Sequence, residues 1–332
     1  MPVCFSDIEN AANRIAPYIH RTPLVMSSRL NAWLGHKLVF KVECLQKTGA
    51  FKARGACNAI SKLVEQGSVP SRIVANSSGN HAQAIAWASA IYDVPATLYM
   101  PKGVSAVKAQ ATKAYGADTV ICENRVLTDQ AVEIAAVETG AVWIPPYNHV
   151  DVIAGQGTAA LEALSDSSNI DAVFAPCGGG GLLSGTLLAT RYLCPKAKVI
   201  GVEPALANDA AESLRKGCIQ SFDSSPDTIA DGARTLAIGP LTFPFLQQLD
   251  SFYEVSEARI AYWTQWLSHL LKLHVEPTSA MVMDGVVQWL SGQREGRTVL
   301  VILSGGNIDS ASSASIWSQD YLLTVPSMAQ AA

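Results

Sequence analysis

Short apolar runs alternate with segments of helical character along most of the chain, and this alternation restricts the fold more than any other feature. Strands are expected at residues 38–45, 73–75, 96–100, 119–122, 142–144, 172–175, 199–202 and 299–303. Helices are expected between them, at residues 80–91, 105–115, 127–138, 153–164, 182–193 and 257–273. Strands separated by helices of this length form βαβ units. The pattern therefore predicts an α/β protein with open, mainly parallel sheets and flanking helices.

The composition indicates a large buried core and argues against several partners. Of the 332 residues, 49% are hydrophobic and 16% are charged, and the net charge is −4. A protein held on nucleic acid by phosphate contacts carries an excess of Lys and Arg. The longest apolar runs are too short to cross a bilayer, and the N-terminus lacks the apolar region of a signal peptide. Seven scattered cysteines indicate reduced thiols. We therefore expect a cytoplasmic protein with no nucleic-acid or membrane partner.

Unusual loops follow five of the predicted strands. They read QKTGAFK (46–52), NSSGNH (76–81), CGGGG (177–181), EPALAND (203–209) and SGGN (304–307). In open parallel sheets, ligands bind outside the carboxyl ends of the strands. The five loops therefore predict one composite binding site.

Four consecutive glycines, Gly178 to Gly181, separate a predicted strand from a predicted helix. Glycines are costly in backbone entropy, and a tight turn needs fewer of them. They allow the backbone to approach an anion closely, next to the positive end of the following helix. The loop has neither the P-loop nor the dinucleotide-binding spacing. It therefore predicts a phosphate site without indicating a nucleotide.

Three other loops leave alternatives open when they are taken alone. Ser77, Ser78 and Asn80 either cap the following helix or bind a substrate carboxylate. Lys52 is either a counter-charge for the phosphate or a lysine that forms a Schiff base. Glu203 and Asp209 offer oxygen ligands to a hard cation. By spacing alone, however, a solvated acidic loop is the better interpretation of EPALAND.

As a set, the motifs resemble the fold-type II pyridoxal-phosphate (PLP) enzymes, whose fold is tryptophan synthase β-like. The resemblance is to the serine racemase and serine/threonine dehydratase family. The matching motifs run in that family's order and span roughly residues 20–310. They are RTPLVMSSRLN, FKVECLQKTGAFKARGACNAI, NSSGNHAQAIA, IPPYNHVDVIAGQGTAALE, PCGGGGLLSG, GVEPALAND, TIADGAR, VEPTSA and LSGGNID.

The resemblance implies a role for each matching site residue. Lys52 would hold PLP through a Schiff base and act as the base at the substrate Cα. Phe51 would pack beside the cofactor ring, Asn80 would meet its hydroxyl and Ser304 would face its nitrogen. The remaining contacts would be Gly178, Gly179, Gly180, Gly181 and Leu182 for the phosphate, and Ser77, Ser78, Asn80 and His81 for the substrate carboxylate.

The implied reaction is deamination of L-serine, L-threonine or a related 3-hydroxy amino acid, by β-elimination of water, to a 2-oxo acid and ammonia. The alternative is a serine or aspartate racemase, in which Ser78 would serve the face opposite Lys52. The resemblance leaves equal weight on Ser78 as a helix cap. A β-replacement synthase is disfavoured, because that branch typically carries a TSGNTG-like loop.

Further partners are implied by the resemblance alone. Glu203, the carbonyl of Ala207 and Asp209 would bind a divalent cation, Mg²⁺, Ca²⁺ or Mn²⁺. ATP would act as an effector at a subunit interface of a homodimer. Its contacts would be Ser27, Ser28, Lys47, Thr48, Gln83 and Asn307.

The family pattern also suggests the domain organisation and one open point about the substrate. Residues 1–71 and 148–332 would form a large PLP-binding domain, and residues 72–147 a small mobile domain. Related racemases and hydroxyaspartate dehydratases often carry an arginine in the segment that matches residues 121–130. Here Thr128 is expected at that place and Arg125 lies nearby. Acceptance of an acidic substrate side chain therefore stays open.

Overall fold

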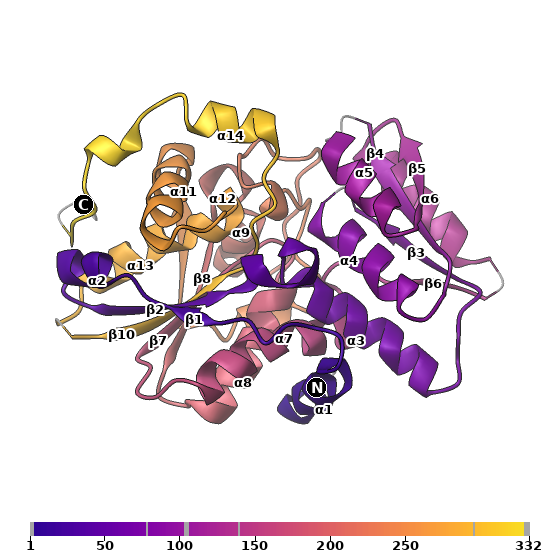
Figure 1. Ribbon diagram of the computed structural model, residues 1–332, viewed down its shortest axis with the longest axis horizontal. Coiled ribbons are helices and arrows are strands. Elements are labelled where there is room, and N and C mark those ends of the chain that lie inside the picture. Colours follow the sequence, from indigo (N-terminus) through magenta and orange to yellow (C-terminus); the bar gives the residue numbers. More distant parts are fainter. Residues whose placement is uncertain (1–2, 78, 103–105, 139, 295, 329–332) are drawn as a thin grey trace.

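The computed structural model describes residues 3–77, 79–102, 106–138, 140–294 and 296–328. Its strands form two separate sheets, and helices pack around both (Figure 1). Every pair of neighbouring strands is parallel except β1 with β2. The expected α/β class with mainly parallel sheets is therefore confirmed.

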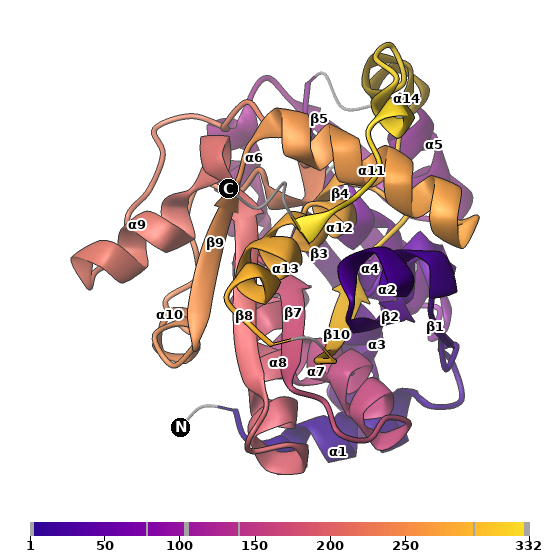
Figure 2. The ribbon, with the colours of Figure 1, turned by 90° about the vertical axis from the view of Figure 1, so that its left-hand side faces the viewer.

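The larger sheet has six strands in the order β1–β2–β10–β7–β8–β9, which lie side by side in Figure 2. They are β1 (Leu24–Val25), β2 (Lys37–Val42), β7 (Ala172–Pro176), β8 (Lys198–Pro204), β9 (Ser251–Val255) and β10 (Thr298–Leu303). The smaller sheet has the order β5–β4–β3–β6. Its strands are β3 (Arg72–Asn76), β4 (Ala96–Pro101), β5 (Asp118–Cys122) and β6 (Ala141–Trp143).

The helices surround these sheets and connect most of the strands. They are α1 (Phe5–Ile15), α2 (Ser28–Leu34), α3 (Lys52–Glu65), α4 (Asn80–Ala90), α5 (Ala106–Ala114), α6 (Arg125–Ala136), α7 (Val150–Ser165), α8 (Gly181–Leu193), α9 (Asp209–Lys216), α10 (Phe243–Leu246), α11 (Glu257–Leu271), α12 (Pro277–Ala280), α13 (Val282–Ser291) and α14 (Ser310–Ile316). Short 3₁₀ turns add η1 (Glu43–Leu45), η2 (Lys47–Gly49), η3 (Ala205–Ala207), η4 (Asp231–Ala233) and η5 (Tyr321–Leu323).

Both faces of the larger sheet are buried, because alternate residues of each strand enter different cores. On β7, Phe174 lies in a core with residues of α11 and α13. Its neighbour Val173 lies in a second core with residues of α7 and α8. The two helix pairs flank the strands in Figure 1. A third core joins β3 and β4 to α3 and α4. Burial on both faces explains why these strands read as continuous apolar runs.

Several boundaries differ from the sequence-based expectation. The strand expected at residues 38–45 ends at Val42, because η1 begins at Glu43, whose buried carboxylate pairs with Arg54. The expectation did not include strands β1 and β9, nor helices α1, α2, α3, α9, α10, α12, α13 and α14. Helix α3 begins at Lys52, inside a stretch that reads as a loop because of its small residues and cations.

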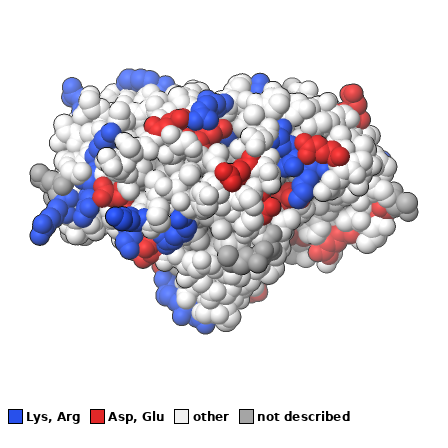
Figure 3. Space-filling model, turned by 90° about the horizontal axis from the view of Figure 1, so that it is seen from below, with Lys and Arg blue, Asp and Glu red and all other residues white. Residues whose placement is uncertain are grey.

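Three further observations concern the surface and the cysteines. Within the described ranges, no helix is long and apolar enough to cross a membrane. The seven cysteines are free thiols. Figure 3 shows basic and acidic side chains interspersed on the face seen from below.

Candidate active site

A cavity lies where the start of α3 and the loops after β3, β7 and β10 meet. Most of the predicted cofactor and substrate residues line it together. They are Phe51, Lys52, Ser77, Asn80, His81, Gly178, Gly179, Gly180, Gly181, Leu182 and Ser304. Ser78 lies outside the described residues. Four of the five predicted loops, which come from both sheets, therefore contribute to one cavity, whereas the loop EPALAND (203–209) does not line it.

Lys52 is the first residue of α3, and its backbone is held against the end of β10. The N–H of Phe51 donates to the carbonyl of Ser304 at 2.9 Å. The Nζ of Lys52 donates to the carbonyl of Pro146 at 2.6 Å and lies 5.0 Å from the centroid of the Phe51 ring. Burial lowers the pKa of Lys52 to about 7, although Glu276 acts to raise it. A large share of Lys52 is therefore neutral at pH 7, as a nucleophilic amine requires.

The glycine loop packs so closely that it excludes side chains. An ideal Cβ on Gly179 would lie 2.2 Å from the ring of Tyr147, and one on Gly178 would lie 2.9 Å from the carbonyl of Gly232. Gly180 has a φ of +88°, which other residues rarely adopt. Helix α8 begins at Gly181, so its N-terminus faces the cavity lined by these glycines. The cradle fits an anionic group such as a phosphate.

Side-chain contacts hold the loop after β3 and the N-terminal end of α4. The hydroxyl of Ser77 accepts from the N–H of Gly79 at 3.2 Å. The Nδ2 of Asn80 donates to both carboxylate oxygens of Glu276, and its Oδ1 accepts from Asn307. His81 Nε2 lies 2.9 Å from the carbonyl of Ile144, and a carbonyl only accepts, so Nε2 carries the proton. Burial lowers the pKa of His81 to about 3, so its ring is neutral.

Ser304 has a neutral hydrogen-bonding environment. Its Oγ lies 2.9 Å from the Oγ of Ser279, and both side chains are buried. The Ser279 hydroxyl also donates to the carbonyl of Gly305 and accepts from its N–H. A group opposite Ser304 would therefore meet a hydroxyl and not a charge.

The cavity contains residues to which the sequence reasoning gave no role. Glu276 belongs to the VEPTSA motif and is buried beside Asn80 and Lys52. Tyr147 belongs to the IPPYNHVDVIAGQGTAALE motif, covers Gly179 and donates its hydroxyl to the carbonyl of Ala237 at 2.9 Å. Both stretches matched the family pattern, and this match could have indicated that the two residues belong to the site.

Arg125 lines the cavity, whereas Thr128 is fully buried and donates its hydroxyl to the carbonyl of Asn124. The Nε of Arg125 donates to Asp129, whose Oδ1 also accepts from Asn76 at 2.6 Å. The expected position of Thr128 therefore does not face the cavity, and Arg125, one helical turn earlier, brings a cation to it.

The predicted metal ligands do not line the cavity. Glu203 lies on β8, and Asp209 is the first residue of α9. Glu203 accepts from the N–H groups of Ala210 and Ala211. Burial raises the pKa of Glu203 to about 9 and that of Asp209 to about 7. The buried Oδ2 of Asp209 makes no hydrogen bond with the described residues. Two buried carboxylates whose pKa burial raises, one with an oxygen that lacks a hydrogen bond, fit a cation together with the buried Ala207.

The predicted nucleotide contacts are only partly brought together. Asn307 Nδ2 donates to the carbonyl of Thr48 at 2.7 Å, in the turn that follows Lys47. Gln83 is buried on α4, which packs against η2. Ser27 caps α2 by accepting from Leu30 N–H, and Ser28 is the first residue of that helix. The turn at Thr48 is therefore connected to Asn80 through Asn307.

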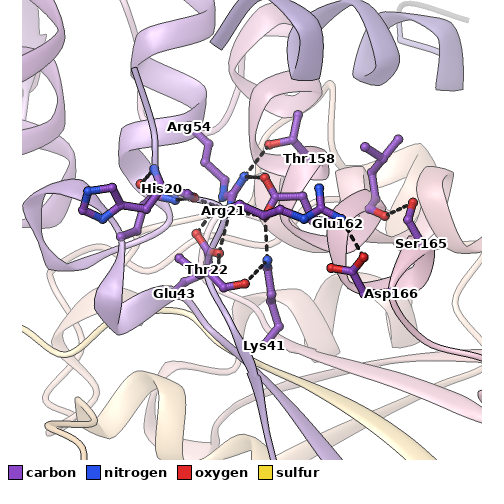
Figure 4. Close-up of polar contacts among 12 residues, drawn as sticks. His20, Arg21, Thr22, Lys41, Glu43, Arg54, Thr158, Glu162, Ser165 and Asp166 are labelled. Atoms are coloured by element: carbon purple, nitrogen blue, oxygen red, sulfur yellow. Dashed lines mark hydrogen bonds and ion pairs between the residues drawn. The ribbon is translucent and has the colours of Figure 1, made fainter. Parts of the chain in front are cut away.

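A buried ion network joins α3 to the rest of the large core (Figure 4). Arg54 is fully buried and makes two hydrogen bonds to each of Glu43 and Glu162. Lys41 donates to the same Glu162 at 2.6 Å. The network therefore contains two cations and two carboxylates. Its member Arg54 lies two residues after Lys52 in the sequence.

Comparisons with known proteins agree with this site. A family model described as pyridoxal-phosphate dependent enzyme matches residues 15–305. L-threo-3-hydroxyaspartate ammonia-lyase of Saccharomyces cerevisiae is 44% identical over 308 residues, which cover 92% of this chain and 93% of the yeast protein. Serine racemase of Dictyostelium discoideum is 39% identical over 318 residues, covering 95% and 98%. A solved threonine deaminase from T.th. has a TM-score of 0.86 at 40% identity, covering 92% and 99%.

These similarities extend over nearly the whole chain. They confirm the resemblance to fold-type II enzymes that the motifs indicate, because the matched proteins share both the sequence and the arrangement of the sheets. The chain therefore belongs to the family of pyridoxal-phosphate dependent enzymes.

Proposed function

We propose that the chain is a PLP-dependent ammonia-lyase that removes water from a 3-hydroxy amino acid and yields a 2-oxo acid and ammonia. The observation that carries the proposal is the half-buried amine of Lys52, with its pKa lowered to about 7, in a cavity that also contains the glycine cradle. Bound there, PLP supplies the electron sink that lets a proton leave the substrate Cα. Relatives at 44% and 41% identity are named L-threo-3-hydroxyaspartate ammonia-lyase.

The cavity residues that the sequence predicted each have a role in this proposal. Lys52 would hold the cofactor, and its amine would accept the proton that leaves the substrate Cα. The backbone of Gly178 to Leu182 would hold the phosphate, and Phe51, Asn80 and Ser304 would contact the ring. Ser77, Ser78, Asn80 and His81 would bind the substrate carboxylate. The neutral ring of His81 contributes by fixing this loop to Ile144.

We propose that the preferred substrate carries an acidic side chain, as in L-threo-3-hydroxyaspartate. Arg125 supports this preference, because Asp129 holds its Nε and leaves the rest of the guanidinium at the cavity. Asp129 is itself oriented by Asn76, which accepts from the indole N–H of Trp143. An arginine held in this way suits a carboxylate on the substrate β-carbon.

The test compares kcat/KM for L-threo-3-hydroxyaspartate, L-serine and L-threonine in the parent and in Arg125→Gln. A hydrogen bond to a charged group is worth about 1.5–3 kcal/mol, or roughly 10- to 150-fold. We expect that loss for hydroxyaspartate and little change for L-serine. An equal loss for all three substrates would contradict the role of Arg125. A chain that deaminates none of them would contradict the lyase itself.

The second candidate function is serine or aspartate racemisation, which the racemase relatives at 39% and 40% identity favour. It needs Ser78 on the face opposite Lys52. We expect Ser78→Ala to keep elimination of L-substrates and to lose racemisation and D-serine turnover, measured by quantifying keto acid and enantiomer together. Racemisation at the parent rate in Ser78→Ala would remove this assignment.

We also propose a bound divalent cation, Mg²⁺, Ca²⁺ or Mn²⁺, at Glu203, the Ala207 carbonyl and Asp209. There it would stabilise the large domain beneath the phosphate loop. Residues 72–147 would move as the small domain and close on the substrate, against residues 1–71 and 148–332. The assembly would be a cytoplasmic homodimer.

ATP is proposed as an effector near Thr48 and Asn307, because their contact leads through Asn80 to Glu276, which faces Lys52. Equilibrium binding of ATP and assays with and without it test this effector. The proposal is wrong if the protein does not bind ATP and its activity is the same with and without ATP.

A further inference from the structure

Gln156 is a buried polar side chain to which neither the sequence motifs nor the cavity assign a role. It lies on α7 and is fully buried. Glycines on both neighbouring helices make room for it. An ideal Cβ on Gly55 of α3 would lie 3.0 Å from its Cγ, and one on Gly181 of α8 would lie 2.5 Å from its Oε1. Burying an amide is costly unless it makes hydrogen bonds, so its contacts indicate why it is there.

The contacts of Gln156 lead directly to Lys52. Its Nε2 lies 3.2 Å from the carbonyl oxygen of Pro146, the same oxygen that accepts from Lys52 Nζ at 2.6 Å. A carbonyl only accepts, so the amide nitrogen must face it and the amide oxygen must face Gly181. This Oε1 makes no hydrogen bond with the described residues. One side chain therefore spans the distance between the glycine cradle and the acceptor of the Lys52 amine.

We propose that Gln156 is a positioning residue for Lys52. It holds the Pro146 carbonyl in the orientation that directs the Lys52 amine into the cavity, and it occupies part of that carbonyl's capacity to accept. The inference rests on the proposed role of Lys52 as the residue that captures PLP. It extends that role to a residue outside the cavity lining.

The shared carbonyl has a consequence for the protonation of Lys52. An oxygen that already accepts from an amide stabilises an ammonium less well than a free one. Loss of the Gln156 amide would therefore raise the pKa of Lys52. Two other titratable groups bear on the amine. Glu276 raises its pKa, and the neutral ring of His81 carries no charge near pH 7.

The experiment measures covalent capture of PLP by the full-length apoprotein as a function of pH, trapped with borohydride and located by peptide mass. The variant is Gln156→Met, which keeps the length and removes the amide, and Gln156→Leu serves if the methionine variant does not fold. The matched control is Gln265→Met. Gln265 is also fully buried and its amide binds the carbonyls of Ile316 and Gln319, but it lies on α11, away from the cavity lining.

We expect capture at pH 7 to be about 5-fold slower in Gln156→Met, the size of one neutral hydrogen bond, and its pH midpoint to move upward. Gln265→Met should keep the parent rate and midpoint. The proposal is overturned if Gln156→Met matches the parent in both, or if Gln265→Met changes them as much. The readout uses no amino-acid substrate. A parent protein that traps PLP on another residue would instead contradict the proposed function.

Discussion

Removal of Arg54 from its buried ion network should destabilise the fold strongly. In the network, Lys41 and Arg54 supply two positive charges and Glu43 and Glu162 two negative ones (Figure 4). Burial on its own would raise the pKa of Glu162, but hydrogen bonds and the charge of Arg54 outweigh it and lower that pKa. The substitution Arg54→Met keeps most of the apolar stem and leaves one uncompensated carboxylate in the core.

The expected cost follows from the burial of the groups that lose their partner. Arg54 and Glu43 are fully buried, and four donor–acceptor contacts of 2.7–2.8 Å to carboxylates disappear. Breaking a buried pair by removing one partner costs about 3–5 kcal/mol. The control is Arg21→Met, because the Arg21–Asp166 pair has side-chain exposures of 58% and 45%. An exposed pair contributes at most about 1 kcal/mol.

The free energy of unfolding of both variants is measured by urea unfolding, followed by circular dichroism and by tryptophan fluorescence. If the two transitions coincide, a two-state free energy can be calculated. The charge argument adds a pH dependence. In Arg54→Met one buried carboxylate of the network has no cation to balance it, and burial raises its pKa in the folded state. The folded state therefore loses stability as the pH rises through that pKa. The deficit should therefore be larger at pH 7 than at pH 5. A deficit no larger than that of Arg21→Met, or one independent of pH, would refute the reasoning.

Three further predictions concern the cavity and the acidic loop. Gly179→Ala should weaken PLP binding at least about 10-fold by titration of the apoprotein, because its Cβ would meet Tyr147 at 2.2 Å, and Tyr147→Ala should restore part of the affinity. Mg²⁺ or Ca²⁺ at about 100 times its Kd should add about 2.7 kcal/mol of stability, seen as a Tm shift that EDTA reverses and Glu203→Gln abolishes. Burial lowers the pKa of Lys52 from 10.5 to about 7, so the unfolded chain binds more protons between these values. Stability of the PLP-free protein should rise with pH in that window, and Lys52→Met should flatten the slope; an unchanged slope would contradict the lowered pKa.

The local motifs made the cavity predictable, because each is complete within a few residues. The four glycines and Ser304 follow strands closely, and Lys52 lies in the segment that leads from β2 into α3. The carboxyl ends of parallel strands meet at one edge of a sheet. The sheets were predictable for a similar reason, since strands buried on both faces read as apolar runs. Strand β9 was not predicted, because its sequence SFYEV lies at the sheet edge and only Val255 is buried.

Contacts between residues far apart in the sequence could not be predicted in this way. The sequence motifs assigned no role to Arg54, yet its carboxylate partners lie 11 and 108 residues away. Thr128 was expected at the substrate by register alone. In the fold its hydroxyl is used within α6, and the side chain at the cavity is that of Arg125. A shift within one helix decides which side chain faces a cavity, and no local pattern records that direction.

The segment between β6 and α7 explains why the fold places the cavity between its two sheets. The carbonyl of Ile144 accepts from His81, that of Pro146 accepts from Lys52, and the ring of Tyr147 covers Gly179. These contacts hold three loops that come from different strands of both sheets. If residues 72–147 move as proposed, the movement would reach the segment that orients the Lys52 amine. The position of the amine would then depend on that movement, and substitutions at Tyr147 should alter both together.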